Sequence, residues 1–125
     1  MAIQYDIQAA GDLLNVRASG KDDSLEEVKA YGGAVIAAAV RHGSRRILCD
    51  ERELVYNLAL IDTFESARFI AESMPHVVQA AIVCNPRSFR DGQFWETVAV
   101  NRGLTVKFFQ DLAAAAAWLE SGPVR

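Results

Sequence analysis

The stretch ILCDERELVYNLALIDTFESARF, residues Ile47 to Phe69, decides the fold, because it begins as a buried strand and ends as an amphipathic helix. Between these two parts lies ERELVYNLALI, residues Glu51 to Ile61. This connection is too long for a tight turn and too apolar for a plain solvated loop. A buried strand followed by an amphipathic helix is typical of an α/β protein, and the unusual connection needs an explanation.

The same periodicities extend over the rest of the chain. Ser24 and Glu27 form a capping box that starts a helix, and Gly43 ends that helix at the C′ position. Inside it, the pair Gly32 and Gly33 suggests close backbone packing. The expected strands are 3–9, 13–18, 46–50, 77–84 and 104–109, and the expected helices are 24–43, 62–73, 93–103 and 111–120.

The predicted order is therefore β-β-α-β-α-β-α-β-α. The turn at Gly11 and Asp12 predicts that the first two strands are antiparallel. The later strands alternate with helices, which indicates parallel pairing through right-handed crossovers. We expect an α/β fold with a single mixed five-stranded sheet and four helices, in one domain that spans residues 1–125.

Composition excludes several classes of function. The chain has 125 residues, of which 51% are hydrophobic and 23% charged, so a compact core is feasible. A net charge of -3 and a pI of about 5.3 argue against nucleic-acid binding and against an anionic membrane surface. No apolar run reaches the roughly 18 residues of a membrane span, and the N-terminus has no signal-peptide pattern. We expect a cytoplasmic protein.

The residues also lack the usual signatures of catalysis. There is no glycine-rich phosphate loop, no Ser-His-Asp order, no zinc spacing and no nucleophile elbow. Cys49 and Cys84 lie in apolar runs, where two buried spectators are expected rather than a redox pair. The sequence predicts no catalytic residue, no metal site and no cofactor.

Three segments resemble the SpoIIAA-like family, a branch of the STAS superfamily that shares features with CRAL-TRIO lipid-binding domains. They are RILCDERELV at 46–55, VQAAIVC at 78–84 and NRGLTVKFFQDLAAAAAWL at 101–119. The resemblance spans nearly the whole chain and concerns packing patterns. It implies the fold above and a regulatory module that acts through protein contacts, sometimes switched by phosphorylation or by nucleotide or lipid binding.

The resemblance also implies where a phosphorylation switch would lie. In anti-sigma-factor antagonists, an aspartate at the end of a strand is followed by a loop and then by Asp-Ser-Ser-Gly at the start of the next helix. Asp50 matches the first aspartate, and Asp62 with Thr63 lies where the later motif would begin. Phe64 and Glu65 stand where the motif has its second serine and its glycine, and this departure argues against the switch.

Two connections leave the carboxyl ends of parallel strands, where α/β sheets bind ligands, and both lead into helix N-termini. They are residues 51–61 and 85–91. Arg87, Ser88 and Arg90 fit either an anion site or a solvated surface. Thr63 either accepts phosphate or, with Asp62, caps its helix. We expect Arg52, Tyr56, Asn57, Thr63, Arg87 and Arg90 to converge in one surface region, and the candidate binding residues add Asp50, Asp62, Asn85 and Ser88.

The apolar side chains of the connection, among them Leu54, Val55 and Leu60, have three interpretations. They form a lid over a cavity, a surface for a partner chain, or a filling for the core beneath them. The leading functional hypothesis is a non-catalytic STAS-like module that binds a protein partner or itself, as a homodimer. The alternative is a carrier for a small apolar ligand, such as a lipid or acyl group, or for a small anionic ligand.

Overall fold

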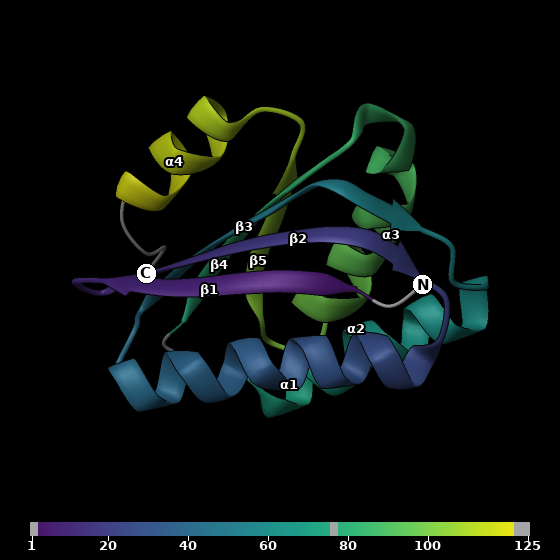
Figure 1. The fold of residues 1–125 in the computed structure, drawn as a ribbon, viewed down its shortest axis with the longest axis horizontal. Helices are drawn as coiled ribbons and strands as arrows, with labels where there is room; N and C mark the ends of the chain where they lie inside the picture. The colour runs from purple at the N-terminus through teal and green to yellow at the C-terminus, as the bar shows by residue number, and fades with distance from the viewer. Residues whose placement is uncertain (1–2, 76–77, 122–125) are drawn as a thin grey trace.

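A computed structural model describes residues 3–75 and 78–121 of the chain (Figure 1). Five strands form one sheet, and four α-helices and one short 3-10 helix pack around it. The strands are β1 (Gln4–Ala10), β2 (Leu13–Asp22), β3 (Arg46–Tyr56), β4 (Gln79–Cys84) and β5 (Thr105–Phe109). The helices are α1 (Leu25–His42), α2 (Leu60–Ser73), η1 (Pro86–Ser88), α3 (Phe89–Val100) and α4 (Leu112–Glu120).

The sheet has the mixed topology that the sequence predicts. Its strand order is β1-β2-β3-β4-β5, with β1 and β2 antiparallel and the other neighbours parallel. The predicted α/β fold and element order are thereby confirmed. In the described part of the chain the strand order never reverses, so the rule that places a ligand crevice at a point of reversal does not apply to this sheet.

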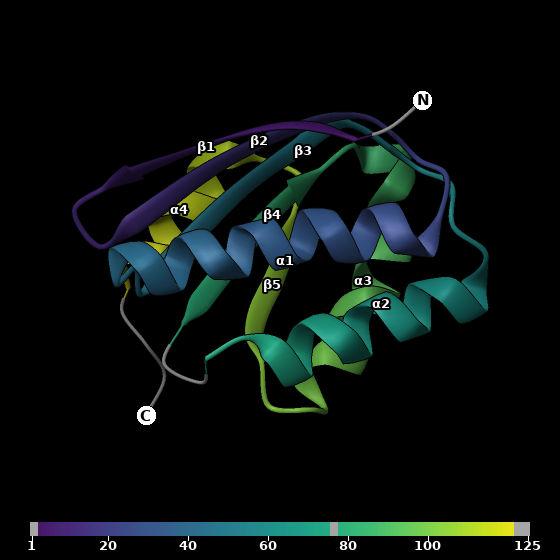
Figure 2. The ribbon, with the colours of Figure 1, turned by 60° about the horizontal axis from the view of Figure 1, so that its bottom comes forward.

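The three crossover helices cover one face of the sheet, and α4 covers part of the other (Figure 2). Every crossover moves to the next strand in the same direction, so right-handed connections place α1, α2 and α3 on the same side. The larger core fills the space between these helices and the sheet. A smaller cluster joins Ala115 and Leu119 of α4 to Ala81 and Val83 of β4. Within the described residues, no helix is long and apolar enough to cross a bilayer.

Several element boundaries differ from the expectation. β2 continues to Asp22 and β3 to Tyr56, while α2 begins at Leu60. The expected eleven-residue connection is therefore wrong, since only residues 57–59 join β3 to α2. The expected loop 85–91 is also mostly helical, because η1 and the first turn of α3 occupy residues 86–91. Val77, the first residue of the expected fourth strand, lies outside the described residues.

Local capping signals in the sequence are confirmed by the structure. The hydroxyl of Ser24 accepts the N–H of Glu27 at 3.1 Å, and Gly43 ends α1 in the left-handed conformation with φ of 64°. Asp111 caps α4 through the N–H of Ala113 at 2.9 Å. Of the two adjacent glycines in α1, only Gly32 lies in close contact, where an added Cβ would lie 2.0 Å from Cδ1 of Ile70.

Gly33 and Gly92 provide a matched pair of substitutions that tests this packing. A Cβ at Gly33 would meet no atom within 4 Å, whereas one at Gly92 would lie 2.4 Å from Cδ2 of Phe108. We expect Gly33→Ala to raise the free energy of unfolding by about 0.5–1 kcal/mol through helix propensity. We expect Gly92→Ala to lower it by about 1–3 kcal/mol through overpacking. Urea denaturation measures both, and equal stability of the two variants would contradict the packing of α3 against β5.

Candidate functional site

A β-bulge in β3 determines which side chains face the core at the carboxyl edge of the sheet. Arg17 of β2 pairs with Asp50, but Ser19 pairs with Glu53, so three residues of β3 span the same length as two of β2. Before the bulge, Cys49 and Glu51 face inward. After it, Leu54 and Tyr56 face inward, because the extra residue reverses the alternation of the strand. This offset explains why the sequence pattern does not indicate one continuous strand.

Glu51 is buried between two tyrosine hydroxyls. Its side chain is only 7% exposed, and its carboxylate accepts the hydroxyl of Tyr31 at 2.7 Å and the hydroxyl of Tyr56 at 2.5 Å. Burial raises the pKa of Glu51, although the two tyrosine hydrogen bonds act in the opposite direction. Burial, followed by the nearby charge of Glu51, raises the pKa of both tyrosines well above the usual value. No lysine, arginine or histidine among the described residues forms an ion pair with Glu51.

A second buried acid, Asp22, fixes the short connection between β3 and α2. Asp22 ends β2 opposite Tyr56, and its carboxylate accepts the backbone N–H of Asn57. Burial raises the pKa of Asp22 to about 6, while the N–H groups of Asn57 and Leu58 oppose this shift. The carboxylate therefore satisfies backbone donors that the end of a strand would otherwise leave unpaired.

A cavity of about 110 Å³ lies between the three crossover helices and the sheet. Most of its lining is aliphatic or aromatic. Three lining residues are acidic, namely Asp22, Glu51 and Asp91, and four carry hydroxyl groups, namely Tyr31, Tyr56, Thr63 and Ser66. The described residues that line it include no lysine, arginine or histidine. Because Asp91 is exposed, the cavity reaches the surface near the start of α3.

The sequence analysis did not identify the residues that give this cavity its polar character. Asp22, Tyr31 and Glu51 were absent from the predicted site residues. The available signal was the alternation of Ile47, Cys49 and Glu51, which places the glutamate on the buried face of a strand. A carboxylate at a core position needs hydrogen-bond donors, but no sequence pattern shows that Tyr31, twenty residues earlier, supplies one.

The predicted convergence of six side chains is wrong, because the sheet separates two of them. Arg52 pairs with Asp50 at 2.8 Å, and this ion pair lies on the face that α4 partly covers. The Arg52 guanidinium lowers the pKa of Asp50. Tyr56 instead points to the opposite face, into the cavity. The physical reason is again the bulge, which places the two side chains on opposite sides of β3.

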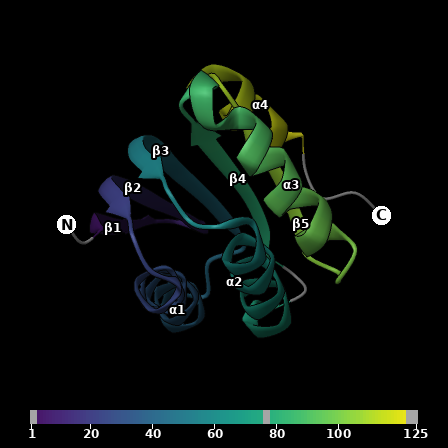
Figure 3. The same cartoon turned by 90° about the vertical axis from the view of Figure 1, so that its right-hand side faces the viewer.

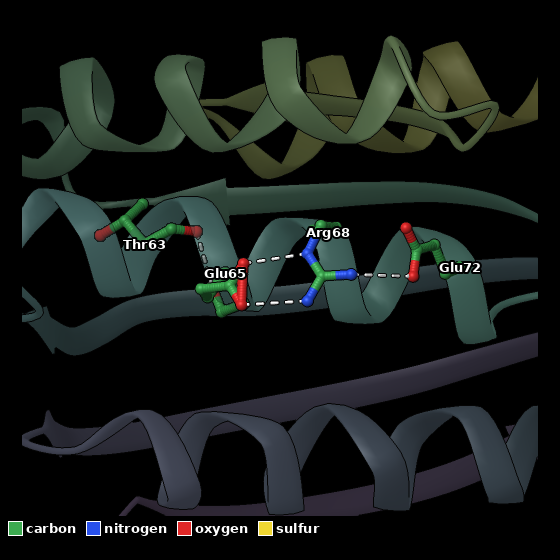
Figure 4. Close-up of polar contacts among 5 residues, drawn as sticks. Thr63, Glu65, Arg68 and Glu72 are labelled. Atoms are coloured by element: carbon green, nitrogen blue, oxygen red, sulfur yellow. Dashed lines mark hydrogen bonds and ion pairs between the residues drawn. The ribbon is translucent and has the colours of Figure 1, made fainter.

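Asp62 and Thr63 do not cap α2. The N-cap is Ala59, without a side-chain hydrogen bond, and Thr63 lies one turn into the helix. There its hydroxyl donates to the carbonyl oxygen of Ala59 at 3.2 Å. Figure 4 shows that α2 also carries an ion-pair ladder, in which Arg68 contacts Glu65 at 2.9 Å and Glu72 at 3.2 Å. Such exposed pairs stabilise the helix slightly.

The residues predicted after β4 form a compact helical turn. The side chain of Asn85 accepts the N–H of Arg87 at 2.9 Å and so caps η1, which continues into α3. Ser88 is half-buried. Arg87 and Arg90 are exposed, and neither forms an ion pair with another described residue.

The two cysteines are buried on the cavity side of neighbouring strands. Cys49 pairs with Ile82, and Cys84 pairs with Glu51, so the two thiols do not lie opposite each other. Burial raises the pKa of both thiols, to about 11 for Cys84, which disfavours the reactive thiolate.

Comparison with known proteins identifies the fold. No family model and no curated protein matches this sequence. Among solved structures, the crystal structure of an anti-sigma factor antagonist from Mycobacterium paratuberculosis aligns with a TM-score of 0.68 and 12% sequence identity, over 95% of both chains. This chain has the fold of an anti-sigma factor antagonist. The fold that the resemblance to STAS domains implied is thereby confirmed, while the activity requires a separate argument.

Asp22→Asn tests the contribution of the buried acid to stability. Because the pKa of Asp22 in the folded state, about 6, exceeds the value of about 3.9 for an unfolded aspartate, the folded state binds more protons between these pH values. The free energy of unfolding therefore falls as the pH rises from about 4 to about 6. The variant keeps an acceptor oxygen for the N–H of Asn57. It has no carboxyl group at this position, so its free energy of unfolding lacks this part of the decrease with pH. We expect it to be more stable than the parent above about pH 6, by on the order of 1 kcal/mol or more.

Urea denaturation of the parent chain and of Asp22→Asn across this pH range measures the difference. The matched control is Asp6→Asn, because Asp6 is an exposed aspartate of β1. A parallel pH dependence in the parent and Asp22→Asn would contradict the assignment.

Proposed function

We propose that this protein is a non-catalytic interaction module that acts through contacts with protein, including a second copy of itself, in the cytoplasm. The observation that carries the proposal is a group of exposed apolar side chains at the carboxyl edge of the sheet. Val55 is 53% exposed, Leu60 68% and Ile61 69%, all within a stretch of seven residues. Contiguous apolar patches mark surfaces that bind other proteins, and in this proposal these three side chains form one.

The edge that carries these side chains is also suited to a contact surface. Figure 3 views the sheet from this edge and shows the N-terminal ends of α1, α2 and α3 arranged along the edge. The surface that we propose, called the edge surface below, consists of Val55, Asn57, Leu60, Ile61, Asp62 and the segment 85–91. Asp50 and Arg52 form an ion pair with each other, and Tyr56 faces the cavity, so we leave these three out.

Charges on the edge surface fit association between two copies. Arg87 and Arg90 are exposed beside Asp91, which is exposed as well, so this short segment presents both signs of charge. A two-fold contact brings the same patch of both copies together and therefore needs a self-complementary surface. Paired with the apolar group, these charges supply the polar rim that surrounds the apolar centre of a typical interface.

A non-catalytic role is supported by the bonds that two acidic side chains already form. Asp50 forms an ion pair with Arg52, and Asp22 accepts a hydrogen bond from the backbone of the β3–α2 connection. The carriage of a lipid or an acyl group has less support, because the cavity measures about 110 Å³. An apolar cavity of about 150 Å³ holds one benzene molecule, which is much smaller than a long acyl chain.

Substitutions in the edge surface test self-association directly. We expect the parent chain to self-associate in sedimentation velocity experiments over a range of concentrations. The double variant Leu60→Ser with Ile61→Ser should weaken this association by at least about tenfold, since it removes the apolar centre of the contact. The matched control is Val40→Ser with Val100→Ser, which alters two exposed valines in α1 and α3 and should leave association unchanged.

Both double variants should keep the stability of the parent to within about 0.5 kcal/mol, because the altered side chains are exposed. A parent chain that remains monomeric at every concentration would contradict self-association. An equal loss of association in both double variants would contradict the location of the edge surface.

A further inference from the structure

The cavity is an unusual feature in a close-packed core. Interiors normally leave few voids larger than one water molecule, and one water needs about 10–15 Å³ of such volume. The cavity here measures about 110 Å³ and lies at the centre of the larger core, between helices and sheet. Because the side chains that line a cavity lack packing partners on that side, a ligand that fits the cavity would gain contacts with them.

Charge restricts what this occupant can be. Asp22, Glu51 and Asp91 line the cavity, and no basic residue among the described residues does. Asp22 already accepts a backbone N–H, whereas the described donors to Glu51 are the hydroxyls of Tyr31 and Tyr56. A carboxylate offers about four acceptor sites, so about two remain on Glu51. A negatively charged ligand is disfavoured here, and a ligand that donates hydrogen bonds is favoured.

The lack of a positive partner for Glu51 strengthens this argument. Burial without a cation shifts a carboxyl group toward its neutral form, whereas a cation beside it favours the charged carboxylate. Within the described part of the chain, Glu51 has two neutral donors and no counter-charge. A cationic ligand would supply the missing charge in the place where Glu51 faces the cavity.

We propose that the cavity is a binding site for a small primary amine, which binds as its ammonium ion with the charged nitrogen on Glu51 and its short apolar body among the aliphatic lining. By comparison with benzene in a cavity of about 150 Å³, the ligand has roughly five non-hydrogen atoms. The ammonium group has three donors, which fit the free acceptor sites of Glu51. This site shares only Asp91 with the edge surface, and it remains testable if self-association fails.

Three ligands with the same branched carbon skeleton test the charge of the site. Isobutylamine, isobutanol and isobutyrate are titrated into the parent chain at neutral pH. We expect saturable binding of isobutylamine, binding of isobutanol at least about tenfold weaker, and no binding of isobutyrate, since a tenfold ratio corresponds to the loss of one good ionic contact. Equal or tighter binding of either of the other two ligands would overturn the proposal, as would a lack of saturation by isobutylamine.

The two tryptophans provide an internal control for the location. Trp95 lines the cavity and donates its indole N–H to Ser66 at 2.9 Å, whereas Trp118 packs against Phe109 on the other face of the sheet. In a two-dimensional NMR spectrum, isobutylamine should shift the indole N–H signal of Trp95 and leave that of Trp118 in place. A shift of Trp118 alone would place the ligand outside the cavity and overturn the proposal.

Glu51→Gln removes the negative charge and keeps the size of the side chain and one acceptor oxygen. We expect it to weaken isobutylamine binding by at least about tenfold, because the ammonium group loses its counter-charge. The matched control is Glu53→Gln. Glu53 lies two residues further along β3 and is exposed, so this variant should bind isobutylamine as the parent does. Unchanged binding in Glu51→Gln would overturn the proposal. The comparison of the three ligands needs no variant, so it decides the question even if Glu51→Gln does not fold.

Discussion

The buried carboxylate of Glu51 accepts hydrogen bonds from two tyrosine hydroxyls, and the arrangement of the carboxyl edge of the sheet depends on these two bonds. Tyr31 comes from α1, and Tyr56 comes from β3 beyond its bulge. The same carboxylate therefore ties a crossover helix to the end of the strand that leads into α2. With Asp22 holding the backbone of the next residue, Asn57, the chain leaves the sheet in a defined direction. The position of α2, and with it the exposed Leu60 and Ile61, follows from this arrangement.

The bulge explains how Glu51 and Tyr56 come to lie on the same side of β3. Without the extra residue, the side chain of position 56 would point to the opposite face from that of position 51. With it, Tyr56 returns toward Glu51 five residues later. The carboxyl group of Glu51 is thereby buried within the larger apolar core. The cost of burying that group is offset by donors that lie at fixed positions on rigid elements.

Much of the fold could be predicted from the sequence because its signals are local. The capping box at Ser24, the glycine at position 43 and the aspartate at position 111 each act within a few residues. The end of β3 could not be predicted, since a bulge interrupts the alternation on which strand recognition depends. The buried acids were missed for another reason. Their partners come from distant parts of the chain, and only the folded arrangement shows that Glu51 lies beside Tyr31.

At 12% identity, the similarity to an anti-sigma factor antagonist shows how far the packing of this fold can persist while its side chains change. Thr63 lies near the start of α2, where its hydroxyl donates to the carbonyl oxygen of Ala59, and Ala59 offers the helix N-terminus no side-chain cap. The function of this chain must therefore be argued from its own residues, above all from the edge surface and the cavity.

The sequential strand order has a consequence for how the chain folds. Each β-α-β unit joins strands that are neighbours in the sheet, so the strands can be added to the sheet in chain order. Each parallel pairing must still close the loop that contains its crossover helix, and this costs loop-closure entropy before the contacts form. As the chain emerges from the ribosome, β3 can pair with β2 before β4 is made, and each later strand then extends an existing edge. The last helix, α4, completes the structure by covering strands that are already in place.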